Sequence, residues 1–165
     1  MRKTILVLVI SSLLLGTSPV LGLSKCTSSQ KSMISSRQSS VQSAQRTLDT
    51  ANAELMRANQ SVNAAQQKVS ANDAQLADFN KRLFAAQDGA NRNMKFPSIQ
   101  RSYLQTITDL NRQISSRQSF WKMDQQTLSQ TLKTQSSAQS RVASAQSSLS
   151  YQQSMLFSLT KQCSN

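Results

Sequence analysis

The fold of this chain is decided by the stretch ISSRQSSVQSAQRTLDTANAELMRANQSVNAAQQKVSANDAQLADFNKRL at positions 34–83. Every seventh residue in it is a branched aliphatic: Ile34, Val41, Leu48, Leu55, Val62, Val69, Leu76 and Leu83. Three positions later a small apolar residue follows in most repeats: Ala44, Ala51, Ala58, Ala65 and Ala86. This repeat predicts a long helix whose apolar seam packs against a partner helix.

The second half of the chain supplies the partner. The first helix is expected over about 27–88, because Gly89 is a typical stop signal. A turn is expected over about 89–97, and a second helix over about 98–162 continues the seven-residue spacing less cleanly from Ile107 to Cys163. A short turn between long helices makes them antiparallel neighbours. The predicted fold class is therefore all-α, a long antiparallel two-helix coiled-coil hairpin.

The first 22 residues have the pattern of a signal peptide. Arg2 and Lys3 precede a short apolar run at 5–16, Pro19 ends the run, and small residues near Gly22 offer a cleavage point. The alternative is an uncleaved membrane anchor. Cleavage would leave residues 23–165 as a single helical domain, secreted or periplasmic.

Cys26 and Cys163 are the only cysteines, near the two ends of the predicted mature domain. In an exported protein two cysteines most often pair. The point halfway between positions 26 and 163 is 94.5, inside the predicted turn, so a hairpin brings both cysteines together. The sequence therefore predicts a terminal disulfide; free thiols or a bridge between chains are the alternatives.

The seam also predicts how the two helices face each other. Large residues of one helix can face alanines of the other, which lets the helices approach closely. One register gives the pairs Ala65–Leu128, Ala51–Val142, Ala44–Leu149, Leu48–Ala145 and Leu55–Ala138.

The residues that enzymes use are scarce. The chain has no histidine, a single glutamate, scattered aspartates, and neither a phosphate-binding loop nor a nucleophile motif. Two thiols do not complete a zinc site. The sequence predicts no catalytic, cofactor-binding or metal site, and hence a protein that works by binding.

Polar residues interrupt the predicted seam at Asn72, Arg117, Asp124, Thr131 and Gln135. One interpretation is that they fix the register of the two helices, as buried polar residues do in coiled coils. The other is a hinge, or a site that grips a ligand between the helices. Arg117 and Asp124, seven residues apart, could form an ion pair.

Apolar residues outside the seam indicate self-association. Leu104 and Leu132 flank one side of the seam in the second helix, and Phe120 and Met155 flank the other. We expect these four to form a homo-oligomer face, most simply in a four-helix bundle of two hairpins. Scattered exposed apolar residues are also common without any function.

The turn is the candidate partner-binding tip. Arg92, Met94, Lys95 and Phe96 combine apolar and basic side chains on a loop, which suits a partner groove or an anionic membrane surface. Alternatively, Met94 and Phe96 cover the end of the seam over Phe79 and Tyr103.

The net charge of +12 favours an anionic partner. For an exported protein that partner is a membrane, a cell-wall polymer, a glycan or an acidic protein rather than nucleic acid, because no nucleic-acid motif is present. The charge can also serve solubility alone.

The general plan resembles the small exported bacterial chaperones of the Skp type: a signal peptide, a high pI, a similar length and a hairpin of long helices. The strand segments by which those proteins trimerise have no counterpart here, so no family is assigned. Three functions are expected in order: a spacer or adaptor that binds a partner protein or an anionic surface, a holdase chaperone for unfolded clients, and a secreted membrane-active effector.

Overall fold

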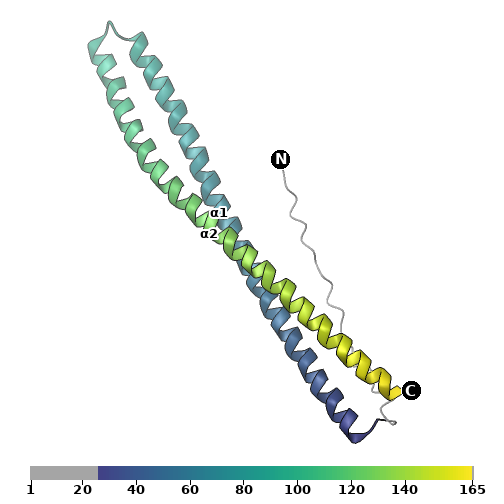
Figure 1. Ribbon diagram of the computed structural model, residues 1–165. Coiled ribbons are helices and arrows are strands. Elements are labelled where there is room, and N and C mark those ends of the chain that lie inside the picture. Colours follow the sequence, from purple (N-terminus) through teal and green to yellow (C-terminus); the bar gives the residue numbers. More distant parts are fainter. Residues whose placement is uncertain (1–25, 165) are drawn as a thin grey trace.

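The computed structural model describes residues 26–164, and these form two long helices joined by a short turn (Figure 1). Helix α1 is Ser28–Arg92, with 65 residues, and helix α2 is Pro97–Ser164, with 68 residues. Each is about 100 Å long at 1.5 Å per residue. The helices pack against each other along the hairpin, and α2 returns beside α1 to the end where α1 begins. The predicted signal peptide lies outside the described residues.

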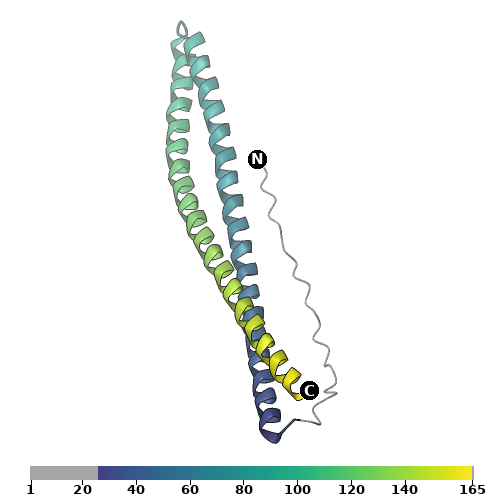
Figure 2. The ribbon, with the colours of Figure 1, turned by 45° about the vertical axis from the view of Figure 1, so that its right-hand side comes forward.

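The two ribbons cross in both views, near the middle of the hairpin in Figure 1 and closer to its open end in Figure 2. In α1 and its cap residue Asn93, every position of the seven-residue rows that start at Ile34 and Arg37 is buried or half-buried. In α2 the same holds for the rows that start at Ile107 and Leu110. The alternating spacing of three and four residues therefore continues without interruption, and the core is a narrow seam rather than a broad layer.

Large side chains face small ones across this seam. Ala44 and Leu149 belong to one buried cluster with Val41, which is consistent with the expected Ala44–Leu149 pair. The most completely buried large side chain is Leu110, which is 2% exposed and lies in the half of α2 next to the turn. Alternating size lets two backbones approach without voids.

A disulfide between Cys26 and Cys163 joins the open end of the hairpin, as predicted. The two Cα atoms are 5.1 Å apart, and both residues are buried beside Ile34. Next to it Thr27 and Gln30 form a capping box: the Gln30 backbone N–H donates to the Thr27 hydroxyl at 3.3 Å, and the Thr27 N–H donates to the Gln30 side chain at 2.9 Å. The end of the hairpin is thus tied both covalently and by hydrogen bonds.

The expected end of α1 at Gly89 is wrong by about one helical turn. Helix α1 continues to Arg92, and α2 begins at Pro97, so the turn is 93–96 rather than 89–97. Gly89 serves packing instead, because a Cβ there would lie 2.5 Å from Cε1 of Tyr103. Ala90, seven residues after Leu83, is buried and keeps the helix in the seam.

Within residues 26–164, neither helix is apolar enough over a sufficient length to cross a membrane.

Candidate functional site

Hydrogen bonds hold the tip of the hairpin in one conformation. The backbone N–H and the Nδ2 of Asn93 both donate to the carbonyl of Gly89, at 3.2 and 2.8 Å. The Phe96 N–H donates to the Asn93 carbonyl at 2.9 Å, and the Phe96 carbonyl accepts from the Gln100 N–H at 3.0 Å. The four-residue turn is therefore fixed to both helices.

The apolar residues of this tip face solvent. Met94 is 61% exposed and Phe96 58%, so neither is buried over Phe79 and Tyr103. Ile99, on the first turn of α2, is 46% exposed and extends the same region. Sequence reasoning missed Ile99, although it lies three residues after Phe96 and outside both seam rows. The tip is thus a small apolar surface at the end of a rod.

The net positive charge of the tip is lower than its number of Lys and Arg residues suggests, because some of them form ion pairs. Arg92 pairs with Asp88 through Nε at 2.9 Å, and Arg82 approaches Asp78 at 3.9 Å. Lys95 and Arg101 are exposed and have no ion pair within the described residues. An anionic group would therefore meet Lys95 and Arg101 first.

A second group of polar residues lies inside the seam, centred on Asn72. Asn72 is 6% exposed; its Nδ2 donates to the Asp124 carboxylate, and its Oδ1 accepts from the Arg117 guanidinium at 3.1 Å. The ion pair that the spacing of Arg117 and Asp124 allows is not present in the described chain; Asn72 lies between them and bonds to both. The Arg117 guanidinium also lies 5.8 Å from the centre of the Phe120 ring.

The other polar seam residues also have partners. Gln135 donates to Asn59 on α1 at 2.6 Å, and Thr131 donates to the Leu128 carbonyl of its own helix at 2.9 Å. A contact that the sequence did not predict joins Trp121 to Asp73, whose carboxylate accepts the indole N–H at 2.7 Å. Among the described residues no buried side-chain polar atom lacks a partner. Because these polar groups are already hydrogen-bonded, a role in fixing the register of the helices is favoured over ligand binding.

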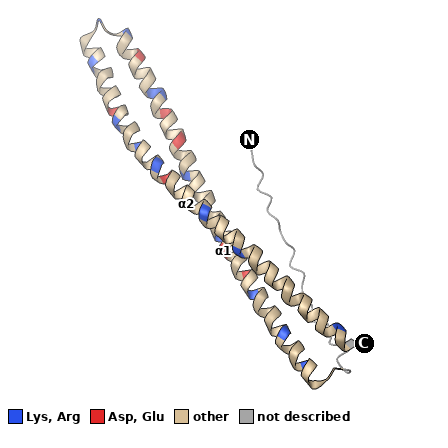
Figure 3. Cartoon of the chain, viewed as in Figure 1, with Lys and Arg blue, Asp and Glu red and all other residues tan. Residues whose placement is uncertain are grey.

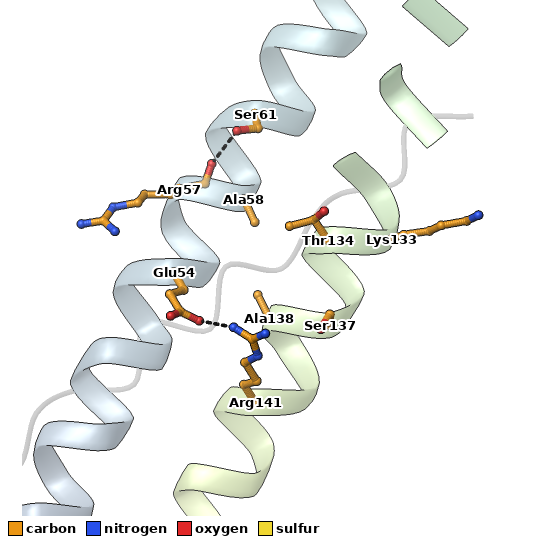
Figure 4. Close-up of a pocket in the computed structure, with 9 residues that line it drawn as sticks. All are labelled: Glu54, Arg57, Ala58, Ser61, Lys133, Thr134, Ser137, Ala138 and Arg141. Atoms are coloured by element: carbon orange, nitrogen blue, oxygen red, sulfur yellow. Dashed lines mark hydrogen bonds and ion pairs between the residues drawn. The ribbon is translucent and has the colours of Figure 1, made fainter. Parts of the chain in front are cut away.

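An open groove lies where Ala58 of α1 faces Ala138 of α2 (Figure 4). It has a volume of about 590 Å³, and Glu54 and Arg141 close one end with an ion pair at 2.8 Å. Arg57 and Lys133 point away from it, and the Ser61 hydroxyl bonds to its own helix at 3.1 Å. Because no set of polar groups converges on the groove, it lacks the character of a small-molecule site.

The four residues of the expected oligomer face do not form a continuous patch. Leu104, Phe120 and Leu132 are exposed and Met155 is half-buried. Leu104 and Leu132 are 28 residues apart, or about 42 Å along the helix. They lie on one side of the seam, whereas Phe120 and Met155 lie on the other.

Charges are spread along both helices, and acidic residues are absent from the parts nearest the disulfide, 26–48 and 125–164 (Figure 3). The described residues contain no group of three acidic, cysteine or histidine residues that could hold a metal ion.

These features define a helical hairpin clamped by a disulfide, with an apolar and basic tip. No family model, no curated protein and no solved structure matches the chain.

Proposed function

We propose that the protein is an exported, non-enzymatic spacer, an antiparallel coiled-coil hairpin that presents its tip to a partner protein or an anionic surface of the cell envelope. The observation that carries the proposal is the exposure of Met94 and Phe96 on a turn fixed at both ends. Two exposed apolar side chains on a rigid loop give up little conformational entropy on binding, so their contact area is available for affinity.

The rest of the molecule fits this role. A seam of alternating three and four residues over two helices of about 100 Å makes a long, stiff support. The disulfide keeps the far end closed, as expected of a protein that works outside the reducing cytoplasm. The exposed apolar side chains away from the tip are scattered, which favours the spacer over a holdase that must cover unfolded chains.

The tip is tested with a photo-crosslinking amino acid at position 98, an exposed position beside the turn, in cells that make the protein, and with flotation of vesicles containing anionic lipid. We expect one dominant crosslinked product or binding to the vesicles, and loss of either in the Met94→Ala/Phe96→Ala double variant. Met123→Ala/Tyr151→Ala is the matched control, because these side chains are 61% and 59% exposed but lie on α2 away from the turn. Equal loss in both variants would contradict a role specific to the tip.

Export and self-association are separate parts of the proposal. Mass spectrometry of the mature protein should find its first residue near Leu23, after removal of the signal peptide. Sedimentation at increasing concentration tests the oligomer, and a strict monomer would remove it.

A further inference from the structure

Carboxamide side chains form two regular rows along one flank of the hairpin. On α1 every seventh position from 38 to 87 is Asn or Gln except Asp73, and on α2 every seventh position from 104 to 153 is Asn or Gln except Leu104 and Leu132. Thirteen of these sixteen positions are therefore amides: Gln38, Gln45, Asn52, Asn59, Gln66, Asn80, Gln87, Asn111, Gln118, Gln125, Gln139, Gln146 and Gln153. We name these thirteen residues the amide ladder.

Contacts across the seam place both rows on the same flank. Asn59 and Asp73 of the α1 row bond to Gln135 and Trp121 of α2. Gln139 and Gln125 of the α2 row follow those two residues by one helical turn, so they lie beside them. The ion pair of Glu54 with Arg141 lies on the opposite flank.

The opposite flank has a different composition. Its sixteen matching positions, every seventh residue at 33–82 and 99–148, hold only two amides, Gln75 and Gln113. The ladder is therefore not a simple result of a chain rich in Gln and Asn. The only charged residue in the two rows is Asp73, which is not part of the ladder and whose carboxylate already accepts the Trp121 indole N–H.

The amides of the ladder are available for binding. All are exposed except the half-buried Gln45 and Gln125. Within residues 26–164, only Gln45 and Asn59 among them make a side-chain hydrogen bond, to Asp49 and Gln135. The other eleven present both a donor and an acceptor to solvent.

Exposed apolar side chains lie beside the ladder. Phe84, Phe157 and Met56 are 73%, 70% and 64% exposed, the highest values among the large apolar residues of the described chain. Phe84 lies between Asn80 and Gln87 on the helix surface, because it is four residues after one and three before the other. The flank thus combines neutral donors and acceptors with apolar surfaces.

We propose that the amide ladder binds a linear, neutral glycan of β-1,4-linked N-acetylhexosamine. Sugar hydroxyl and acetamido groups both donate and accept, as carboxamides do, while the apolar faces of pyranose rings stack on Phe84 and Phe157. The sixteen positions of the two rows hold no cation, and Arg101 and Lys122 are the only cations one position further out in the repeat, where Phe84 and Phe157 lie, so the flank is not built to select a polyanion. The repeat also fits: seven helical residues rise about 10.5 Å, close to one disaccharide of an extended β-1,4-linked chain. Several amides of the ladder can thus bind one glycan chain at the same time, and many weak contacts add up to useful affinity.

The proposal is independent of the tip and is tested by titrating the intact, oxidised protein with β-1,4-linked N-acetylglucosamine oligomers of two to six units. The single tryptophan, Trp121, lies next to the ladder and gives a fluorescence signal, with calorimetry as the second readout. We expect affinity to rise roughly tenfold from tetramer to hexamer, because the longer glycan reaches one more repeat of the ladder. Maltohexaose, an α-1,4-linked chain of different repeat, should not bind.

Two triple variants make the test specific. Asn52→Ala/Gln66→Ala/Asn80→Ala removes three amides of the ladder and should weaken hexamer binding by about tenfold or more. Thr47→Ala/Ser61→Ala/Gln75→Ala changes the opposite flank and should leave binding unchanged. Circular dichroism checks that both retain the helical content. Met94→Ala/Phe96→Ala should bind the hexamer like the native protein, even if it loses the partner of the tip.

Three results would overturn the proposal. The first is no binding of the hexamer at millimolar concentration, and the second is equal binding of maltohexaose. The third is a dimer, seen by sedimentation, that is lost in the ladder variant while no glycan binds. That last result would assign the flank to contact between copies of this chain.

Discussion

At the scale of single residues, Asn72 shows why a polar side chain persists in an apolar seam. Both ends of its carboxamide are used, one by Asp124 and the other by Arg117, both from the opposite helix. The complete bridge forms in only one register, because a shift by one seven-residue repeat would separate Asn72 from either Arg117 or Asp124. The cost of an unpaired buried polar group then opposes the shifted pairing.

Replacing Asn72 by Ala should lower the free energy of unfolding by about 1–3 kcal/mol, because Asp124 and Arg117 lose their shared partner. Denaturant titration measures the change. Asn63→Ala is the control, since Asn63 is exposed on the same helix, and it should change stability by less than about 0.5 kcal/mol. Equal effects of the two substitutions would show that the bridge does not contribute.

At the scale of the element, each helix is long because nothing in its seam breaks the spacing of three and four residues. Gly89 illustrates the competition between local and tertiary preferences. Its propensity favours a helix end, but Ala86 and Ala90 are both buried on either side of it, and the Tyr103 ring occupies the space where a Cβ would lie. Packing against α2 therefore carries α1 through the glycine to Arg92.

The substitution Gly89→Ala should have opposite effects in two backgrounds. With Tyr103 present it should destabilise the protein by about 1–3 kcal/mol, because the new Cβ overlaps the ring. In a Tyr103→Ala background the same change should stabilise it by up to about 1 kcal/mol, through helix propensity alone. A double-mutant cycle by thermal unfolding measures both values. Stabilisation by Gly89→Ala in the native background would refute the role given to Tyr103.

At the scale of the whole molecule, the hairpin is closed at both ends, by the turn at 93–96 and by the disulfide. Most tertiary contacts join residues on a narrow seam, so each end depends on few neighbours. The disulfide spans 137 positions of sequence, and a loop of that size has a large closure entropy.

The Cys26→Ser/Cys163→Ser variant should lose up to about 5 kcal/mol of stability, the chain-entropy value for a loop of this length. We also expect faster amide hydrogen exchange near both termini and little change near the turn, since the seam there is intact. Guanidinium titration and exchange mass spectrometry measure the two effects. A uniform rise in exchange along both helices would show instead that the hairpin unfolds as one unit.

Much of this could be predicted from the sequence because the signals are local and periodic. The spacing from Ile34 to Leu83 predicts α1 and its buried side, and the positions of Cys26 and Cys163 predict the closed end. The spacing of Arg117 and Asp124 allowed a direct pairing, but it could not reveal Asn72, the residue on the other helix that bonds to both. The Trp121–Asp73 contact could not be derived from one helix considered alone, because the two residues lie on different helices.

The sequence by itself determined that the chain forms two long helices and that its cysteines meet, since a seven-residue apolar repeat cannot bury its seam without a partner. Only the tertiary structure decided where α1 ends, which polar side chains bridge the seam, and which flank each row of side chains occupies. The physical reason is that these features depend on how far each helix slides and rotates against the other. That position is set by the fit of particular pairs, such as Gly89 against Tyr103 and Ala44 against Leu149.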